Sequence, residues 1–163
     1  MSDEPKAPGR WHTREDSGLM LDEKLQWWHD GERIDHPKIV EAFNRGLEVQ
    51  PDGRVKLKFG NDWAFITVKA CAFSVVAVDV VEAEKKISIR LSDRTAEWLD
   101  VGSLTLDAEG VFTCAVKEAK ARARFSREAH FQLASVATDE QGALVFHIGD
   151  STLRSSIPRS AIE

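Results

Sequence analysis

The feature that most constrains the fold is an order of local signals that occurs twice along the chain. From Trp27 to Asp62, and again from Thr113 to Ser151, the sequence predicts a hairpin, a helix, an Asp/Gly turn, a strand and a second glycine turn. The two glycine turns of one half match those of the other at a constant spacing of 89 residues. This order predicts an internal duplication of a β-β-α-β unit, with convergent patterning as the alternative.

Residue patterns along the chain predict the individual strands and helices. Alternating apolar and polar residues predict strands at 55–59, 63–68, 73–81 and 87–91. Apolar spacing predicts a short helix over 20–26, a helix from Pro37 that ends at Gly46, and a helix over 127–137 capped by Ser126. We therefore predict an α+β fold with mostly antiparallel sheets, in which two similar β-β-α-β halves are joined by a central β-meander. The predicted divisions are a flexible N-terminal arm at 1–18, a first half at 19–82 and a second half at 83–163.

Composition narrows the range of functions. The chain has 163 residues, 22 Lys and Arg against 27 Asp and Glu, and a formal net charge of −5, which is unlike a general nucleic-acid binder. It contains no apolar run of membrane-spanning length and no secretory leader, so we expect no membrane partner. Its two cysteines, Cys71 and Cys114, are far apart and form no CxxC motif. This pattern favours a reduced, cytoplasmic compartment and no zinc site, and it leaves the oligomeric state open.

Several short motifs together resemble a known bacterial family. They are Trp28–Ile34, the Pro37–Phe43 helix, Asp52-Gly53, Trp63–Val68 followed by Ala72-Phe73, and Ala123–Arg127 before the second helix. In this order they are similar to the family called domain of unknown function 1285 (DUF1285). The resemblance implies an α+β fold of two similar halves. It implies no established activity, and it suggests a role in signalling or ligand sensing.

The candidate binding residues begin with a basic stripe on one predicted strand. Lys120, Arg122 and Arg124 alternate with alanines and so share one face, with Arg127 just beyond. Guanidinium groups two residues apart on a strand can clamp phosphate or carboxylate, and the helix that starts after Ser126 would add its dipole. The alternative is an ordinary solvated strand face.

Tryptophans are the second set of candidates. The adjacent Trp27 and Trp28 must face opposite sides of a strand, so one can enter the core while the other stays near the surface. Trp28 and Trp63 are our candidates for an apolar wall of a ligand site at the seam between the halves, and core filling is the alternative for both.

These features predict a non-enzymatic ligand-binding or regulatory (signalling) module. We expect it to bind an anionic small molecule or an acidic protein partner. No nucleophile motif, Gly-rich phosphate loop or histidine pair at ligand spacing is present, so we assign no catalytic residue, no cofactor and no metal. Two alternatives stay open. One is a hydrolase with a dispersed site at His29, Asp30 and Asp62, and the other is a dimeric interaction module that uses sheet edges or the 98–106 segment.

Overall fold

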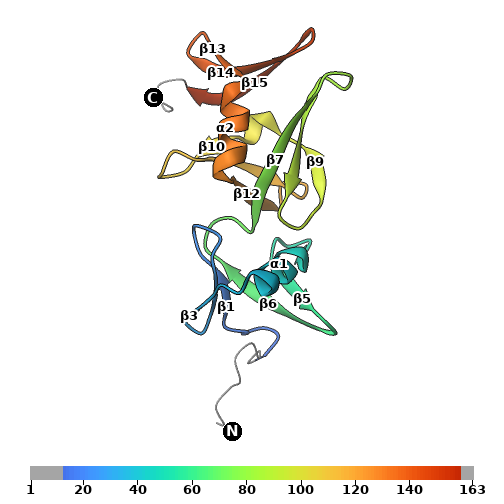
Figure 1. The fold of residues 1–163 in the computed structure, drawn as a ribbon, viewed down its shortest axis with the longest axis vertical. Helices are drawn as coiled ribbons and strands as arrows, with labels where there is room; N and C mark the ends of the chain where they lie inside the picture. Colours follow the sequence, from blue (N-terminus) through green and yellow to red (C-terminus); the bar gives the residue numbers. More distant parts are fainter. Residues whose placement is uncertain (1–12, 159–163) are drawn as a thin grey trace. The chain divides into compact units, whose positions relative to one another are not determined.

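The computed structural model describes residues 13–158, which divide after Ala72 into two compact units (Figure 1). The predicted boundary at 82/83 is therefore ten residues too late. Strand β7 (Phe73–Val81) belongs to the second unit because it pairs with β8 (Lys86–Leu91) and β12 (Ala121–Phe125) of that unit.

Part of the predicted N-terminal arm is ordered against the first unit. Its residues 1–12 lie outside the described chain. Further on, the Phe65 N–H donates a hydrogen bond to the Arg14 carbonyl at 2.8 Å, and Ser17 is only 2% exposed. The arm therefore does not extend to residue 18 as predicted.

The first unit has one sheet and one helix in its described part. Its elements are β1 (Leu19–Leu21), β2 (Trp27–His29), β3 (Glu32–Ile34), α1 (Pro37–Arg45), β4 (Leu47–Val49), β5 (Val55–Phe59) and β6 (Asp62–Val68). The sheet order is β3-β2-β1-β6-β5-β4, with every pair antiparallel except β1 and β6. Strand β6 changes partner along its length, since its residues 62–66 pair with β5 and its residues 67–68 pair with β1.

Helix α1 begins and ends as the sequence predicts, although for a different reason at its end. The His36 ring accepts the Lys38 N–H, and Pro37 occupies the first turn. Phe43 is the buried residue of the helix, and its ring meets Trp27 and Phe59 edge-on at 5.0 and 5.1 Å. Gly46 ends the helix with φ −89°, so no left-handed conformation requires glycine there. A Cβ at this position would instead overlap the Lys58 carbonyl oxygen of β5.

The predicted helix over 20–26 is wrong. Leu19 and Leu21 are both buried in β1, so the apolar pattern has period two rather than helical spacing. A tight turn follows, in which the Asp22 carboxylate accepts the N–H groups of Lys24 and Gln26, both at 2.9 Å, and Leu25 has φ +61°. Local capping by an aspartate thus replaces the expected helix.

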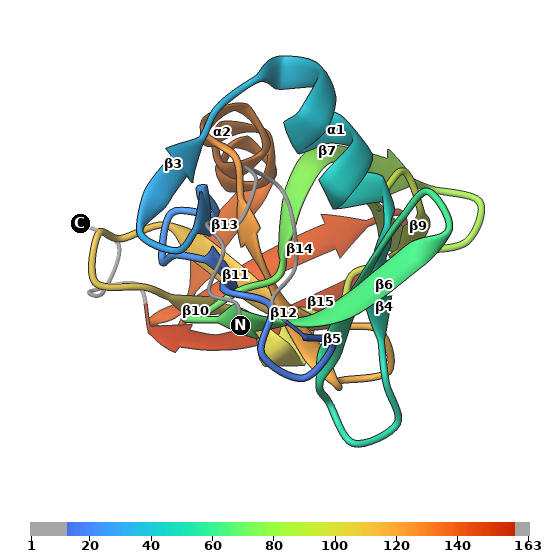
Figure 2. The same ribbon diagram turned by 90° about the horizontal axis from the view of Figure 1, so that it is seen from below.

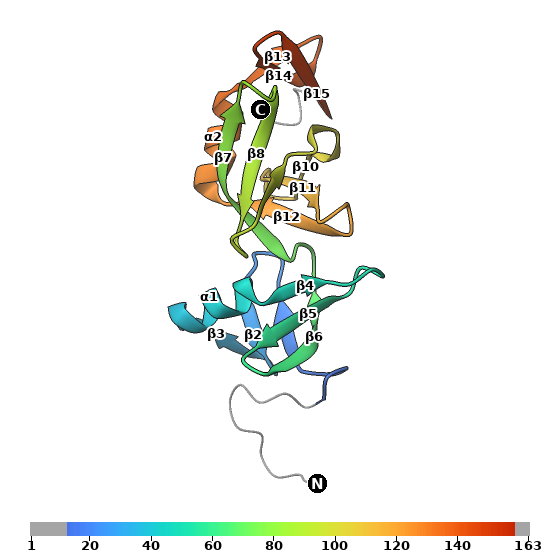
Figure 3. The same cartoon turned by 90° about the vertical axis from the view of Figure 1, so that its right-hand side faces the viewer.

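The second unit has two sheets in its described part. Beyond β7, β8 and β12, its elements are β9 (Ala96–Trp98), the 3-10 turn η1 (Val101–Ser103), β10 (Thr105–Leu106), β11 (Phe112–Val116), α2 (Arg127–Ser135), β13 (Ala137–Glu140), β14 (Ala143–Ile148) and β15 (Ser151–Pro158). The larger sheet has the order β10-β11-β12-β7-β8-β9, and β13-β14-β15 form a separate antiparallel sheet. Helix α2 lies against β7 and β12 (Figures 1 and 3).

Two similar halves are present, but the fold class is mostly β, which corrects the predicted α+β class of β-β-α-β units. Each half runs hairpin, helix and three-stranded meander, because β4 and β13 follow directly after the two helices. For the first unit, Figure 2 shows β3 leading into α1 and the β4–β5–β6 meander beyond it. The predicted central meander over the strands at 55–91 is divided between the units, because β5 pairs with β6 in the first unit whereas β7 pairs with β8, and β8 with β9, in the second. Residue 137 begins β13 rather than ending α2 as predicted, and Val136, which caps the end of α2, is 39% exposed.

Among residues 13–158, neither helix combines the length and the apolar character that a membrane crossing requires.

Candidate functional site

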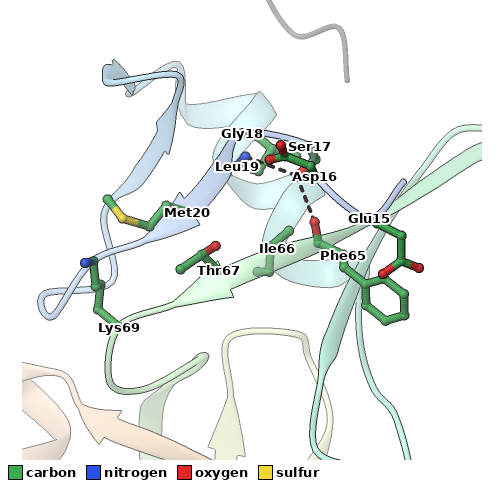
Figure 4. Close-up of a pocket in the computed structure, with 10 residues that line it drawn as sticks. All are labelled: Glu15, Asp16, Ser17, Gly18, Leu19, Met20, Phe65, Ile66, Thr67 and Lys69. Carbon is green, nitrogen blue, oxygen red and sulfur yellow. Dashed lines mark hydrogen bonds between the residues drawn. The ribbon is translucent and has the colours of Figure 1, made fainter. Parts of the chain in front are cut away.

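A pocket in the first unit lies where β6 changes partner. Residues 15–20 form one wall and residues 65–67 with Lys69 form the other, around a cavity of about 200 Å³ (Figure 4). We call it the β1–β6 pocket. The two strands pair only at their ends, through Met20 with Thr67 and Leu21 with Val68, so their earlier residues are free to separate.

Ser17 holds the separated strands at the pocket. Its hydroxyl donates to the Phe65 carbonyl at 2.8 Å and accepts the Leu19 N–H at 3.1 Å, as the dashed lines of Figure 4 show. A side chain thus replaces a backbone-to-backbone bond. Because Ser17 is buried and both of its bonds are made to backbone groups, this wall of the pocket is fixed in position.

The pocket carries both signs of charge. Glu15 and Asp16 lie toward one end and Lys69 toward the other, with Met20, Ile66 and Thr67 between them (Figure 4). The Glu15 carboxylate already accepts a hydrogen bond from Arg54 at 3.0 Å. Such a wall can hold a small molecule with both polar and apolar parts.

This pocket was not predicted from the sequence. Its residues have no catalytic or ligand-binding spacing, and they come from two segments about 50 residues apart. The one local signal is a serine and a glycine directly before the alternating Leu19–Leu21 strand, which the helical interpretation obscured.

The predicted basic stripe lies on β12, and one of its cations is committed to carboxylates. Arg124 donates to Asp107 through Nε and to Glu109 through Nη2, both at 2.7 Å, and its side chain is 18% exposed. Burial tends to raise the pKa of Asp107, but the Arg124 bond and the N–H groups of Val111 and Glu109 outweigh it and lower that pKa. Arg124 therefore ties β12 to the β10–β11 turn.

Arg122 is different, because neutral oxygens surround it. Its Nη2 donates to the Ser103 carbonyl, the Thr105 hydroxyl and the Thr113 hydroxyl at 3.2, 3.1 and 2.8 Å. Within residues 13–158 its guanidinium forms no ion pair. These bonds orient the group without neutralising its charge.

The other two basic candidates lie apart from this pair. Lys120 follows three consecutive left-handed residues, 117–119, and its ammonium is 3.5 Å from Glu118. Arg127 begins α2, and its guanidinium lies 5.8 Å from the centre of the Phe131 ring.

The two tryptophan candidates belong to the first unit, whereas all four basic candidates belong to the second. Trp27 is buried and Trp28 is half-exposed, which confirms that the two rings face opposite sides of β2. The Trp28 indole N–H donates to Asp22 at 2.9 Å. The Trp63 ring contacts the cationic groups of Arg14 and Lys56 at 4.7 and 4.4 Å from its centre. The proposed seam site stays a prediction.

The structure does not bring the hydrolase candidates together as one hydrogen-bonded group. His29 is 3.6 Å from the Asp30 carboxylate, but Asp62 pairs with Arg14 at 3.3 Å and accepts the Trp63 N–H at 2.8 Å. In the described chain no cluster of three or more His, Cys, Asp or Glu side chains could hold a metal ion. Cys71 and Cys114 are buried.

A row of acid, histidine and hydroxyl lies on the third sheet. His147 bonds to Glu140 on one side and lies 3.2 Å from the Thr152 hydroxyl on the other. The bond to His147 lowers the pKa of Glu140, which burial tends to raise. The His147 and Glu140 side chains are 44% and 40% exposed on a strand face, so we assign them to cross-strand stabilisation.

The arrangement of strands and helices in this chain also occurs in known proteins. No family model and no curated protein matches the chain. Two crystal structures are similar to it. A DUF1285 family protein from Silicibacter pomeroyi DSS-3 has 19% identity and a TM-score of 0.64, and the match covers 97% of this chain and 90% of that one. A DUF1285 family protein from Shewanella baltica OS155 has 12% identity and a TM-score of 0.52, and the match covers 72% of this chain and 91% of that one.

The protein is thus a mostly β chain of two similar halves. It has the DUF1285 fold, and the resemblance stated from the sequence is confirmed at the level of the fold. A fold shared at this identity carries no function with it.

Proposed function

We propose that this chain is a non-enzymatic ligand-binding module, and that the β1–β6 pocket holds a small polar molecule. The observation that carries the proposal is the separation of β1 from β6, held open by the buried Ser17 hydroxyl. Backbone groups of adjacent strands ordinarily pair with one another. A gap supported by a buried side chain is a built feature of the sheet.

The size and lining of the pocket indicate the kind of ligand. Pockets for drug-sized molecules measure about 300–1,000 Å³. A cavity of about 200 Å³ suits something smaller, of the size of a simple metabolite. The apolar surface of Met20 and Ile66 beside the charged groups favours a molecule with both apolar and charged parts.

The test is a thermal-shift and ligand-detected NMR screen of the full chain. The panel contains amino acids, short carboxylates, amines, sugars and nucleotides. A ligand at 100 times its Kd should stabilise the protein by about 2.7 kcal/mol. The variant Thr67→Trp fills the pocket from an exposed strand position and should abolish the shift. Thr67→Val keeps the volume and should retain it. A shift that persists in Thr67→Trp would place the ligand elsewhere and contradict the proposal.

Arg122 favours a second candidate function, the binding of an anion or an acidic protein segment by the second unit. Its charge is oriented by three oxygens and has no carboxylate partner within residues 13–158. Phosphate, acyl phosphates and an acidic peptide are the probes. Arg122→Gln should abolish their binding, whereas Thr67→Trp should leave it unchanged. Equal binding by the parent and Arg122→Gln would rule this candidate out.

A further inference from the structure

We infer that the ligand of the β1–β6 pocket is a small zwitterion, with its ammonium group at Asp16 and its carboxylate at Lys69. This inference rests on the proposed function, because it identifies the ligand class of the same pocket.

The charged side chains that line the pocket differ in whether they already have an ion-pair partner. Three charged side chains line it, and Glu15 is already engaged by Arg54. Asp16 and Lys69 have no ion pair within the part of the chain that the structure describes, and only their backbone groups form hydrogen bonds there. One anion and one cation are therefore available to a ligand.

The two available charges are separated along the pocket. Asp16 belongs to the segment before β1 and Lys69 to the segment after β6, and Figure 4 shows them toward opposite ends of the pocket. Between them lie Met20, Ile66 and Thr67, which offer an apolar surface and one hydroxyl. The order along the pocket is thus anion, uncharged middle and cation.

The pair of opposite charges favours one class of ligand. A neutral molecule uses neither charge, and a simple anion or cation uses one and meets the other as a like charge. A molecule with an ammonium at one end and a carboxylate at the other satisfies both. Hydrogen bonds between ionised groups are stronger than neutral ones, although exposure to water weakens them. We expect each charged contact to strengthen binding roughly tenfold.

Calorimetric titration of the full chain with a graded series tests the inference. Glycine, β-alanine, 4-aminobutanoate and 6-aminohexanoate vary the distance between the two charges, while propylamine and propanoate each carry one charge. We expect one spacing to bind most tightly, and to bind at least about tenfold more tightly than either singly charged compound.

Charge variants give an independent readout. Asp16→Asn and Lys69→Gln should each weaken the best zwitterion about tenfold. The exchange of both charges, Asp16→Lys with Lys69→Asp, should restore binding because the ligand can reverse its direction. Both positions are exposed, so folding should be unaffected. Glu23→Gln and Lys38→Gln make the same charge changes at exposed positions outside the pocket and should have no effect.

The outcomes separate this inference from the proposed function. If propylamine or propanoate binds as tightly as the zwitterions, and Thr67→Trp abolishes that binding, the pocket is a ligand site but the zwitterion inference is wrong. If no member of the series binds the parent, the inference is also wrong, and the wider panel described above decides about the pocket separately. Failure of the exchanged variant to recover binding, when both single variants lose it, would contradict the two-ended arrangement.

Discussion

The two halves of the molecule contain the same order of elements and join them differently. In the first unit β1 pairs with β2 on one side and with β6 on the other, so one sheet includes both the hairpin and the meander. The matching strand of the second unit is β10, which pairs with β11 in the same antiparallel sense. Strand β15 lies near η1 and β10 but belongs to the separate β13–β15 sheet.

The joining strands also differ in length and in what flanks them. Strand β10 has only two residues, preceded by the η1 turn and followed by Asp107, whose carboxylate accepts the N–H groups of Glu109 and Val111 at 2.8 and 3.0 Å. A duplicated order of elements therefore does not determine which strands share a sheet.

The hairpins differ at their outer edges as well. In the second unit the outer edge of β12 pairs in parallel with β7 at residues 73–75. In the first unit β3 is the last strand of its sheet among the described residues, and it is only three residues long. Very short edge strands limit unwanted pairing with other chains.

The largest expected effect comes from removing matched core side chains. Leu57 and Phe146 occupy equivalent strands, 89 residues apart, and are 0% and 1% exposed. Leu57→Ala should cost about 2–5 kcal/mol and Phe146→Ala about 3–5 kcal/mol in the free energy of unfolding. Urea denaturation followed by circular dichroism measures both. A loss under about 1 kcal/mol at either position would show that the two cores are not equivalent.

The next effect concerns buried serines that serve the same purpose in each half. Ser17 bridges Phe65 and Leu19, and Ser155 likewise donates to the Leu144 carbonyl and accepts the Ile157 N–H, at 3.1 and 3.2 Å. Replacement by alanine leaves backbone groups unsatisfied, so Ser17→Ala and Ser155→Ala should each cost about 1–3 kcal/mol. Melting curves of the two variants check this. Only Ser17→Ala should also weaken ligand binding in the first unit. If the parent and Ser17→Ala bind the ligand with equal affinity, Ser17 does not contribute to ligand binding in the pocket.

A pH effect should be specific to the second unit. The His130 ring accepts the Phe112 N–H at 3.2 Å and so must be neutral at that nitrogen. Burial lowers the pKa of His130 below its usual 6.5, and the Asp107 carboxylate only partly opposes this. Because the unfolded chain binds the proton first, the contribution is complete above pH 6.5 and decreases as the pH falls toward the folded-state pKa.

We expect this loss to be about 1 kcal/mol, the net value of one hydrogen bond. Denaturation of the parent and of His130→Gln at pH 7, 6 and 5 isolates it, since the other histidines are common to both proteins. The parent should lose more stability than His130→Gln over this range. Parallel curves would show that His130 does not contribute to the pH dependence.

The smallest effects come from the two helix caps. The Ser126 hydroxyl accepts the Ala129 N–H at 3.1 Å, whereas the His36 ring reaches the Lys38 N–H at a longer 3.3 Å in an exposed position. Ser126→Ala should cost about 1 kcal/mol, and His36→Ala no more than about 0.5 kcal/mol. Thermal melts of both variants measure the order, and a larger loss for His36→Ala would reverse it.

Local chemistry explains how much of the fold was predictable. The Asp30-Gly31 hairpin has φ values of +50° and +84°, as such two-residue turns require, and Pro37 and Ser126 lie at the helix starts. These signals act over a few residues, so a single sequence reveals them. Strands β4 and β13 were missed because each has only three or four residues and begins within two residues of the end of a helix.

The candidate site was less predictable, because it depends on which distant residues meet. The alternation along β12 predicted that Arg122 and Arg124 share one face, but not that Asp107 and Glu109 would neutralise one of them. Likewise, nothing near Ser17 indicates that its hydroxyl would meet Phe65, 48 residues further on.

The repeated order of elements, the tight turns and the helix starts follow from backbone preferences and short-range hydrogen bonds, so they could be predicted from the chain alone. The folded chain was needed to establish which strands share a sheet, where β1 and β6 separate, and which charges remain available to a ligand. Those outcomes depend on contacts between residues far apart in the chain, and a local pattern carries no information about its distant partner.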